Sequence, residues 1–300
     1  MRRSQAAFIC GAVAAEFLLL AATTDSFFTA ANLSNVLRQN AFTSILAAGM
    51  TFVILTGGID LSVGSIVGLA GVLCADLLAR GVPIWAAAAG ALSLGLAVGG
   101  ANGVFITRLR IPPFIVTLAM MLIARGLAFK YTDARTITGL PAAFASLAGG
   151  FSTALIVCVV FGLTWLVLMR MPFGRHVYAV GGNAEAARLS GISVNNVQLA
   201  VYTICGGCAG LSGVLVASRL NAGYPRAGEF YELDAIAAVV VGGTSLFGGR
   251  GSIWGTLAGA FFIGVLNNGL NLFRVSTYDQ LILKGLVLLA AASLDRWRTG

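Results

Sequence analysis

The stretch LTGGIDLSVGSIVGLAG, residues 55–71, lies inside an apolar run that extends over residues 41–79. A membrane crossing takes roughly 20 apolar residues, so this run is too long for one span. Gly57-Gly58 is the natural place for the chain to turn, because glycine reaches backbone conformations that other residues avoid. The stretch therefore predicts two membrane helices joined by a glycine turn.

Asp60 is the one charged residue of this stretch. It could be a catalytic acid, an ion site inside a membrane, or part of the turn. The first backbone N–H groups of a helix need partners, and in lipid each unpaired group is costly. A carboxylate at the N-cap supplies such a partner and suits the helix dipole. We therefore expect Asp60, with Ser62 close behind it, to cap the second helix.

The composition is that of a membrane protein. The 300 residues are 58% hydrophobic and 10% charged, with a mean hydropathy of +0.91, whereas soluble domains carry about 25% charged residues. The 39 glycines suit closely packed membrane helices. The net charge of +8 comes almost wholly from single arginines between apolar runs. That pattern indicates control of topology and contact with lipid headgroups rather than nucleic-acid binding.

The sequence predicts an all-α polytopic membrane protein with about ten spans. The expected spans are 6–22, 41–57, 62–79, 84–106, 114–129, 151–169, 197–217, 235–249, 252–272 and 279–294. The first is expected to be an uncleaved helix rather than a signal peptide. The eighth is too short for a full crossing and is broken at Gly242-Gly243. Arginine placement favours both termini on the inside, with residues 1–300 forming one transmembrane domain.

Signals for catalysis are missing from the sequence. It contains no GxxxxGK[ST] phosphate loop and no GxSxG elbow. His176 is the only histidine, and the Cys205–Cys208 pair lies in an apolar run without further ligands. We therefore expect no catalytic residues, no cofactor and no metal. Glu16 is the only carboxylate plainly at membrane depth, which weakens the hypothesis of an ion-coupled carrier.

The inner segment, approximately residues 170–196, contains the signals of a short helix. Asn183 is expected to be its N-cap, and Gly191 its stop. A helix of about two turns is unstable alone and needs a surface on which to pack. It is either part of an ordinary loop or a docking element for a cytoplasmic partner. The residues that would form this docking element, which the resemblance described below makes the coupling residues, are Arg175, Gly182, Asn183, Ala184, Glu185, Ala186, Ala187, Arg188, Leu189 and Gly191.

Two outer segments also carry signals. Asn32 is a plausible N-cap for a short amphipathic helix that ends near Asn40. Further along, mixed charges are expected in one loop. This loop suits either docking of a binding protein or plain exposure to solvent. Its charged residues are Arg219, Arg226, Glu229, Glu232 and Asp234.

Several of these stretches resemble the ribose-type sugar permeases of bacterial ABC importers, within the branched-chain amino acid/sugar permease superfamily. Residues 55–71 are similar to their most recognisable signature. GGNAEAARLSGISV, residues 181–194, looks like the coupling loop of ABC-importer permeases. VVVGGTSLFGGRGSIWGTLAGAFFIGVLNNGLNL, residues 239–272, resembles the C-terminal signature, and IPPFIVTLAMMLIARGLA, residues 111–128, is also similar. The resemblance covers nearly the whole chain, in order.

The resemblance implies a multi-pass subunit of the bacterial inner membrane without an ATPase site of its own. Its expected partners are a cytoplasmic ATP-binding subunit, a second permease copy or paralogue, an extracytoplasmic solute-binding protein and the lipid bilayer. The signature-loop residues that it carries over are Gly57, Gly58, Asp60, Ser62, Gly64, Gly242, Gly243, Gly248, Gly249 and Gly251.

The expected function is uptake of a ribose-like monosaccharide by alternating access, driven by the separate ATPase. Two alternatives stay open. The same machinery could import another small neutral solute, such as a branched-chain amino acid, a nucleoside or a sugar-derived signal. Less favoured is an ion-coupled secondary transporter that acts alone.

Overall fold

The computed structural model describes the backbone of residues 2–24 and 26–299. Its elements are α1 (Arg2–Thr23), α2 (Ala30–Leu55), α3 (Val63–Ala79), α4 (Ile84–Arg108), α5 (Pro113–Thr132), α6 (Ala142–Ala145), the 3-10 helix η1 (Ser146–Ala148), α7 (Gly150–Arg170), α8 (Pro172–Gly182), α9 (Ala184–Leu189), α10 (Val194–Leu220), α11 (Tyr231–Val241), α12 (Ile253–Leu272) and α13 (Thr277–Thr299). The side chains of Arg2, Arg3, Arg296 and Arg298, which entered the topology prediction, lie outside the described residues.

The all-α prediction is confirmed. Nine of the ten expected spans are helical over most of their length, whereas the eighth, 235–249, is helical only as far as Val241. Over the described part of the chain no strand is formed beyond one bridge between Ile137 and Gly223. Five helices, α4, α5, α7, α10 and α12, are long and apolar enough to cross a membrane by length and composition. The others are shorter or carry more polar residues, and they include the interrupted helices α3 and α11.

Helix α10 is the centre of the bundle, and small residues let its neighbours approach closely. Gly206 and Gly210 of α10 face Gly95 and Gly99 of α4, with the two backbones in contact. A Cβ at Gly95 would collide with the Gly206 carbonyl oxygen. Close backbone approach through small residues is the usual way in which membrane helices pack, since lipid offers no hydrophobic driving force between helices.

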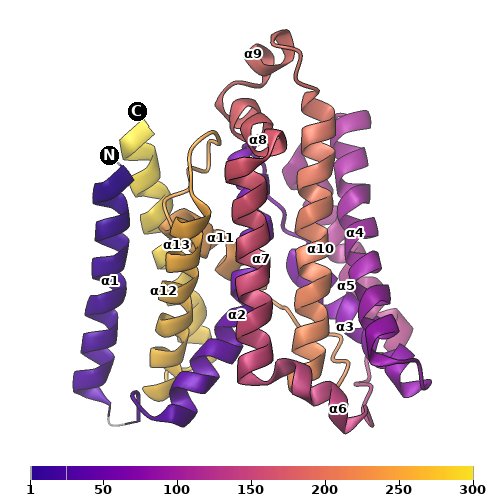
Figure 1. Ribbon diagram of the computed structural model, residues 1–300. Helices are drawn as coiled ribbons and strands as arrows, with labels where there is room; N and C mark the ends of the chain where they lie inside the picture. Colours follow the sequence, from indigo (N-terminus) through magenta and orange to yellow (C-terminus); the bar gives the residue numbers. More distant parts are fainter. Residues whose placement is uncertain (1, 25, 300) are drawn as a thin grey trace.

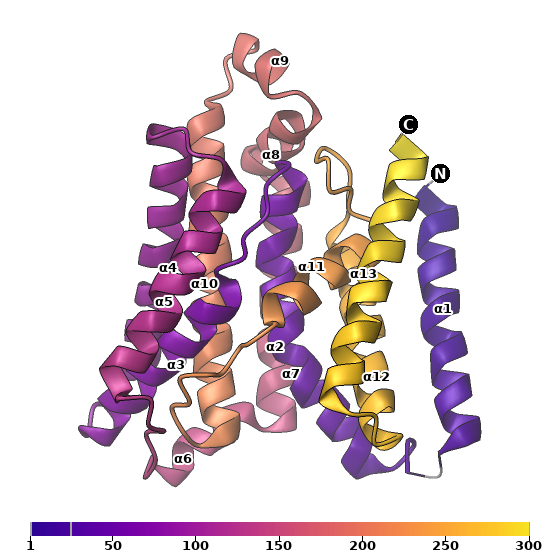
Figure 2. The same cartoon turned by 180° about the vertical axis from the view of Figure 1, so that it is seen from behind.

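The two ends of the chain lie at the same end of the bundle, as an even number of spans predicts (Figure 1). Helices α8 and α9 project at that end, together with the loop between α11 and α12. Helix α6 and the α1–α2 connection lie at the opposite end, in both views (Figure 2). The termini and the segment 170–196 therefore share a face, which we call the inner face.

The prediction for residues 32–40 is wrong. A single helix, α2, runs from Ala30 to Leu55, and its N-cap is Thr29, whose hydroxyl accepts from the Asn32 N–H at 3.2 Å. Asn32 instead lies in the first turn, and its side chain bonds Asn268 of α12. Because the helical pattern continues from this first turn into the apolar stretch, nothing divides the segment into two helices.

The prediction of one exposed charged loop before α11 is also wrong. Arg226 and Glu229 are exposed and lie 3.8 Å apart. Asp234, by contrast, is buried within α11, and Glu232 packs directly on Gly64 of α3. Residues 221–230 rise from the outer end into the middle of the bundle, where α11 begins (Figure 2). The chain re-enters the bundle here, so charges that follow each other in sequence end at different depths.

Arg125 of α5 holds this re-entrant segment in place. Its Nη1 donates to the carbonyl oxygens of Pro225 at 2.7 Å and Ala227 at 2.8 Å. Irregular backbone at membrane depth is tolerated only where its polar groups find partners inside the protein. The guanidinium group supplies those partners, which explains why an arginine occurs within an otherwise apolar span.

Candidate functional site

Asn183 makes the corner between α8 and α9. Its backbone N–H donates to the Ala179 carbonyl oxygen at 3.1 Å and so ends α8. Its side-chain oxygen accepts from the N–H groups of Glu185 at 3.0 Å and Ala186 at 2.9 Å and so begins α9. The predicted helix over residues 184–189, with Asn183 as its N-cap, is therefore confirmed.

Helix α9 ends at a left-handed glycine, as predicted. Gly191 has φ +84°, and the Ile192 N–H closes back on the Ala187 carbonyl oxygen at 3.0 Å. Ala187 is buried, whereas Leu189 is 83% exposed at the tip of the structure. Glu185 and Arg188 form an exposed ion pair at 3.0 Å, which contributes little stability. The helix thus presents an apolar residue and two charges to solvent.

Helix α8 is held to the membrane helices by contacts between glycine backbones. Gly181 lies against the last residue of α2, where a Cβ would collide with the Leu55 carbonyl oxygen. That same oxygen accepts from the Gly249 N–H at 2.9 Å. Gly248 and Gly249 have φ +83° and +71°, which favours glycine, and both contact the Gly181–Gly182 backbone. We call Leu55, Gly181, Gly182, Gly248 and Gly249 the glycine junction.

The junction joins three segments that are far apart in sequence. The C-terminal end of α8, the C-terminal end of α2 and the α11–α12 loop meet there. A groove of about 330 Å³ opens beside it, lined by Gly181, Gly182, Ser245, Phe247, Gly248, Gly249 and Arg250. The structure thus brings the predicted coupling segment against parts of both predicted signature loops.

The glycines of the signature loops have the roles of turn residues. Gly57 (φ +78°) follows α2, and Gly243 (φ +88°) follows α11, as the prediction of turns at both Gly-Gly pairs requires. Gly58 contacts the Tyr202 side chain, and Gly251 contacts Thr244 within its own loop. Arg175 lies exposed on α8, away from these turns.

Asp60 is not the N-cap of α3, which corrects the prediction. Ser62 occupies the cap position and makes no side-chain capping bond to the helix. The Asp60 carboxylate, fully buried, accepts from the Ser62 N–H at 2.9 Å and the Ser62 hydroxyl at 2.6 Å. Asn102 of α4 donates to that hydroxyl at 2.9 Å. The aspartate therefore fixes the turn two residues before the helix and, through Ser62, ties it to α4.

Sequence reasoning missed two polar contacts of the α11–α12 loop. Asp295 of α13 accepts from the Ser245 hydroxyl at 3.1 Å and from the Leu246 N–H at 3.0 Å. The Tyr178 hydroxyl of α8 donates to the Gly251 carbonyl oxygen at 3.1 Å. These contacts hold the loop between α8 and α13. No spacing in the sequence indicates them, since the partners lie some 50 to 70 positions apart.

The cysteines and carboxylates suggest no metal centre. Cys205 is buried, and Cys208 packs against Gly49 of α2. Among the residues whose side chains the structure describes, which exclude Cys10, no group of three or more His, Cys, Asp or Glu is placed to hold a metal ion. The inner face carries a projecting helix, α9, beside the backbone contacts of the glycine junction.

Comparisons with known proteins identify the family of this chain. The family model described as branched-chain amino acid transport system / permease component matches residues 32–292. The chain is 45% identical over 286 residues to the ribose import permease protein RbsC of Escherichia coli K12, covering 92% of this chain and 89% of the relative. It is 47% identical over 287 residues to the ribose import permease protein RbsC of Bacillus subtilis 168, covering 93% and 89%.

A more distant relative is the xylose transport system permease protein XylH of Escherichia coli K12, 38% identical over 354 residues and covering 95% of this chain and 90% of the relative. No solved structure matches this chain. The family and the apolar helices place the chain in the bacterial inner membrane. The chain belongs to the branched-chain amino acid transport system permease component family.

Proposed function

We propose that this chain is the transmembrane permease subunit of an ATP-binding-cassette importer that takes up a monosaccharide, with an aldopentose such as ribose as the first candidate. The observation that carries the proposal is 45–47% identity, over most of the chain, to permeases named for ribose import in two distant bacteria. Relatives named for xylose and allose transport are less similar, at 38% and 40%. All of these relatives support a sugar as the transported solute, and the higher identity to the ribose permeases favours ribose.

Helix α9 is proposed as the element that engages a cytoplasmic ATP-binding subunit. It projects furthest at the inner face (Figure 1), and it carries an exposed leucine between polar residues. An apolar tip with a charged surround suits insertion into a cleft of a partner protein. Arg175 and Arg188 are exposed and can pair with acidic residues of that partner or with lipid headgroups.

The glycine junction is proposed to pass the motion of α8 and α9 to the membrane helices. Because the contact is made by backbone atoms, no flexible side chain can absorb a displacement of α8. A movement of Gly181 would act directly on the end of α2 and, through Gly249, on the loop that leads into α12. Rigid-body motion of these helices is the physical basis of alternating access.

The remaining partners belong to the same proposal. One permease domain over residues 1–300 would work as a pair, with a second copy or a paralogue completing the pore. A solute-binding protein would deliver the sugar at the outer end. Of the charged residues predicted for docking, Arg219, Arg226 and Glu229 are exposed. ATP hydrolysis would reside wholly in the ATP-binding subunit.

Uptake by the reconstituted complex tests the function. The permease is reconstituted into proteoliposomes with an ATP-binding subunit, and a solute-binding protein is added. ATP-driven uptake of labelled D-ribose, D-allose, D-xylose, leucine and adenosine is then compared. We expect uptake of a sugar, ribose above the others, that requires ATP. Uptake of leucine or adenosine alone would assign a different cargo. Uptake by the permease alone under an ion gradient would overturn the importer.

A further inference from the structure

A polar pocket lies inside this single subunit, in the outer half of the bundle. It is bounded by α2, α11, α12 and α13 and has a volume of about 90 Å³. One water molecule needs about 10–15 Å³ of such space, so the pocket accommodates several hydroxyl groups. The polar side chains that line it are Gln39, Asn40, Thr43, Tyr231, Asp234, Asn267, Asn271, Gln280 and Lys284.

The pocket has a rim at the outer end and a buried floor. Asn271 and Gln280 flank the α12–α13 turn and bond each other at 3.0 Å. Asn271 is exposed, whereas Asn40 and Asp234 are 3% and 5% exposed. Polar groups thus continue from solvent into the bundle. This pattern describes an entry route rather than an isolated pair of buried groups.

The floor carries hydrogen-bonding groups that the protein leaves unused. Neither side-chain atom of Asn40, oxygen or nitrogen, has a partner among the described residues, and the same holds for the Asn267 oxygen. Asn40 has no room to turn away, because its amide packs on the Gly264 backbone. An unpaired buried amide costs several kcal/mol in an apolar medium, so these groups call for a polar occupant.

The same two helices show what a purely structural amide pair looks like. Asn32 of α2 and Asn268 of α12 bond each other twice, at 3.0 and 2.8 Å. Asn268 is the immediate neighbour of Asn267, and both pairs bridge α2 and α12. The Asn32–Asn268 pair is therefore satisfied within the protein. The Asn40 amide and the Asn267 oxygen are left open, while the Asn267 nitrogen donates to Asp234 at 3.4 Å.

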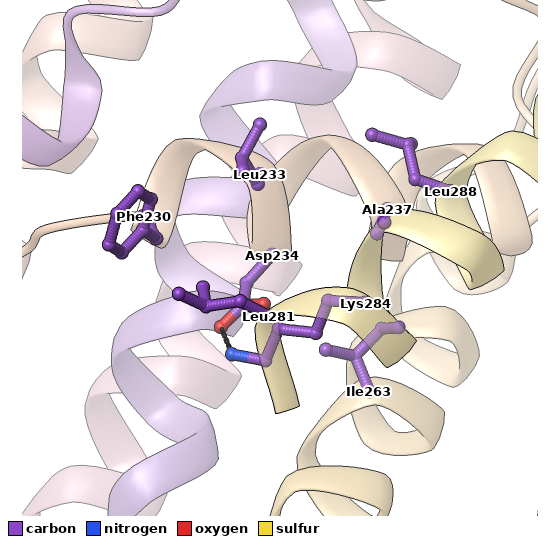
Figure 3. A pocket seen from close by; sticks show the side chains of 9 residues that line it. Phe230, Leu233, Asp234, Ala237, Ile263, Leu281, Lys284 and Leu288 are labelled. Carbon is purple, nitrogen blue, oxygen red and sulfur yellow. Dashed lines mark hydrogen bonds and ion pairs between the residues drawn. The ribbon is translucent and has the colours of Figure 1, made fainter. Parts of the chain in front are cut away.

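The charges that line the pocket indicate which class of ligand it can bind. Asp234 and Lys284 form an ion pair at 2.9 Å between α11 and α13, so the pocket has both signs of charge and no net charge (Figure 3). On its other side this pair faces an apolar pocket of about 50 Å³ that is lined by Phe230, Leu233, Ala237, Ile263, Leu281 and Leu288 (Figure 3). A neutral solute with many hydroxyl groups matches the donors and acceptors of the polar pocket.

We propose that Asn40, Asn267 and the Asp234–Lys284 pair form a subsite that binds hydroxyl groups of the transported solute after it enters from the outside. The subsite rests on the proposed function, since it supplies the sugar path with contacts inside one subunit. Within the subsite, the amides and the ion pair contact the hydroxyl groups of the solute.

The test uses the complete reconstituted complex and the matched pair of amides. Asn40→Ala and Asn267→Ala are expected to lower ATP-driven D-ribose uptake per folded complex about tenfold, as loss of hydrogen bonds to hydroxyls would do. Asn40→Ala should do so without lowering the melting temperature, because neither atom of its amide has a partner among the described residues. Asn267→Ala also removes the bond to Asp234 and should lower the melting temperature slightly. Asn268→Ala is the matched control, because it removes the two bonds to Asn32. It should lower the melting temperature and leave uptake per folded complex normal. Equal uptake by all three variants would overturn the subsite.

Uptake of deoxy sugars gives a second measurement. If Asn40 had only a structural role, its substitution would not change the uptake of a deoxy sugar relative to ribose. Uptake of mono-deoxy riboses is measured relative to ribose in the wild type and in Asn40→Ser, a milder variant. The preference of the binding protein is common to both measurements and cancels in the comparison. We expect the penalty for at least one deoxy sugar to shrink about fivefold in the variant. An unchanged penalty for every deoxy sugar would overturn the subsite.

Failure of the proposed function looks different. A wild-type complex that takes up none of the sugars would overturn the function and the subsite together. Normal uptake by the wild type with no difference between the pocket variants and Asn268→Ala would overturn the subsite alone.

Discussion

The glycine junction lies toward the inner end of the bundle and the polar pocket in its outer half. The junction is formed by backbone atoms, whereas the pocket is lined by polar side chains. At the junction the Leu55 carbonyl, Gly181 and Gly249 meet backbone to backbone, and the Gly249 N–H is satisfied. In the pocket, side chains from four helices converge, and the amide of Asn40 is left without a partner. A contact that transmits force must be stiff and complete, whereas a site that receives a ligand must keep polar groups open.

The largest expected loss of stability follows from breaking the Asp234–Lys284 ion pair of the pocket. Asp234→Ala leaves the Lys284 ammonium buried without its partner, which should destabilise the protein by about 3 to 5 kcal/mol. Thermal unfolding in detergent measures this. The double variant Asp234→Leu/Lys284→Met should recover most of the stability, because it removes both charges, yet it should not recover uptake. Recovery of uptake in the double variant would contradict a polar role for the pair.

The second effect is at the junction. Gly181→Ala places a methyl group on the Leu55 carbonyl oxygen and must shift backbone, so overpacking should cost about 1 to 3 kcal/mol and lower uptake strongly. Gly182→Ala is the matched control, since the space beside the neighbouring glycine is open. Thermal stability and uptake are compared for the two variants. Similar behaviour of both would show that the close contact at Gly181 has no consequence.

The smallest effect is expected outside both regions, at Asp60 in the connection between α2 and α3. Asp60→Asn keeps an oxygen for the two bonds from Ser62, and its amide nitrogen replaces an oxygen that has no hydrogen-bond partner among the described residues. Stability should change by less than about 1 kcal/mol, with uptake retained. Asp60→Leu removes both bonds and should impair folding. A well-folded Asp60→Asn protein that cannot transport would instead give Asp60 a direct role in the pathway.

The sequence predicted those parts of the fold that depend on local pattern. Apolar runs of sufficient length located a helix over each expected span, and the Gly-Gly pairs located the turns after α2 and α11. The helix at residues 184–189 was predictable to the residue, because its cap and its stop are both local signals. The roles assigned to these residues stay predictions.

The predictions that were wrong concern features that depend on tertiary structure. Asn32 has the chemistry of a cap, yet it lies within a helix that Thr29 begins, because its amide is used by Asn268 across the bundle. In the sequence, Asp234 follows other charged residues and is expected in an exposed loop. The chain instead re-enters the bundle there and buries its carboxylate. The polar pocket could not be foreseen, since it joins residues from 39 to 284 that share no motif.

The central claim is that α9 couples ATP hydrolysis to transport, and the ratio of sugar moved to ATP hydrolysed measures this directly. Ala187→Pro removes the N–H that donates to the Asn183 carbonyl oxygen at 3.0 Å and should break α9. Ala184→Pro is its control, since proline is tolerated at the first position of a helix. The account predicts a ratio at least about tenfold lower for Ala187→Pro, with the membrane helices intact, and a normal ratio for Ala184→Pro. An unchanged ratio in Ala187→Pro would contradict it.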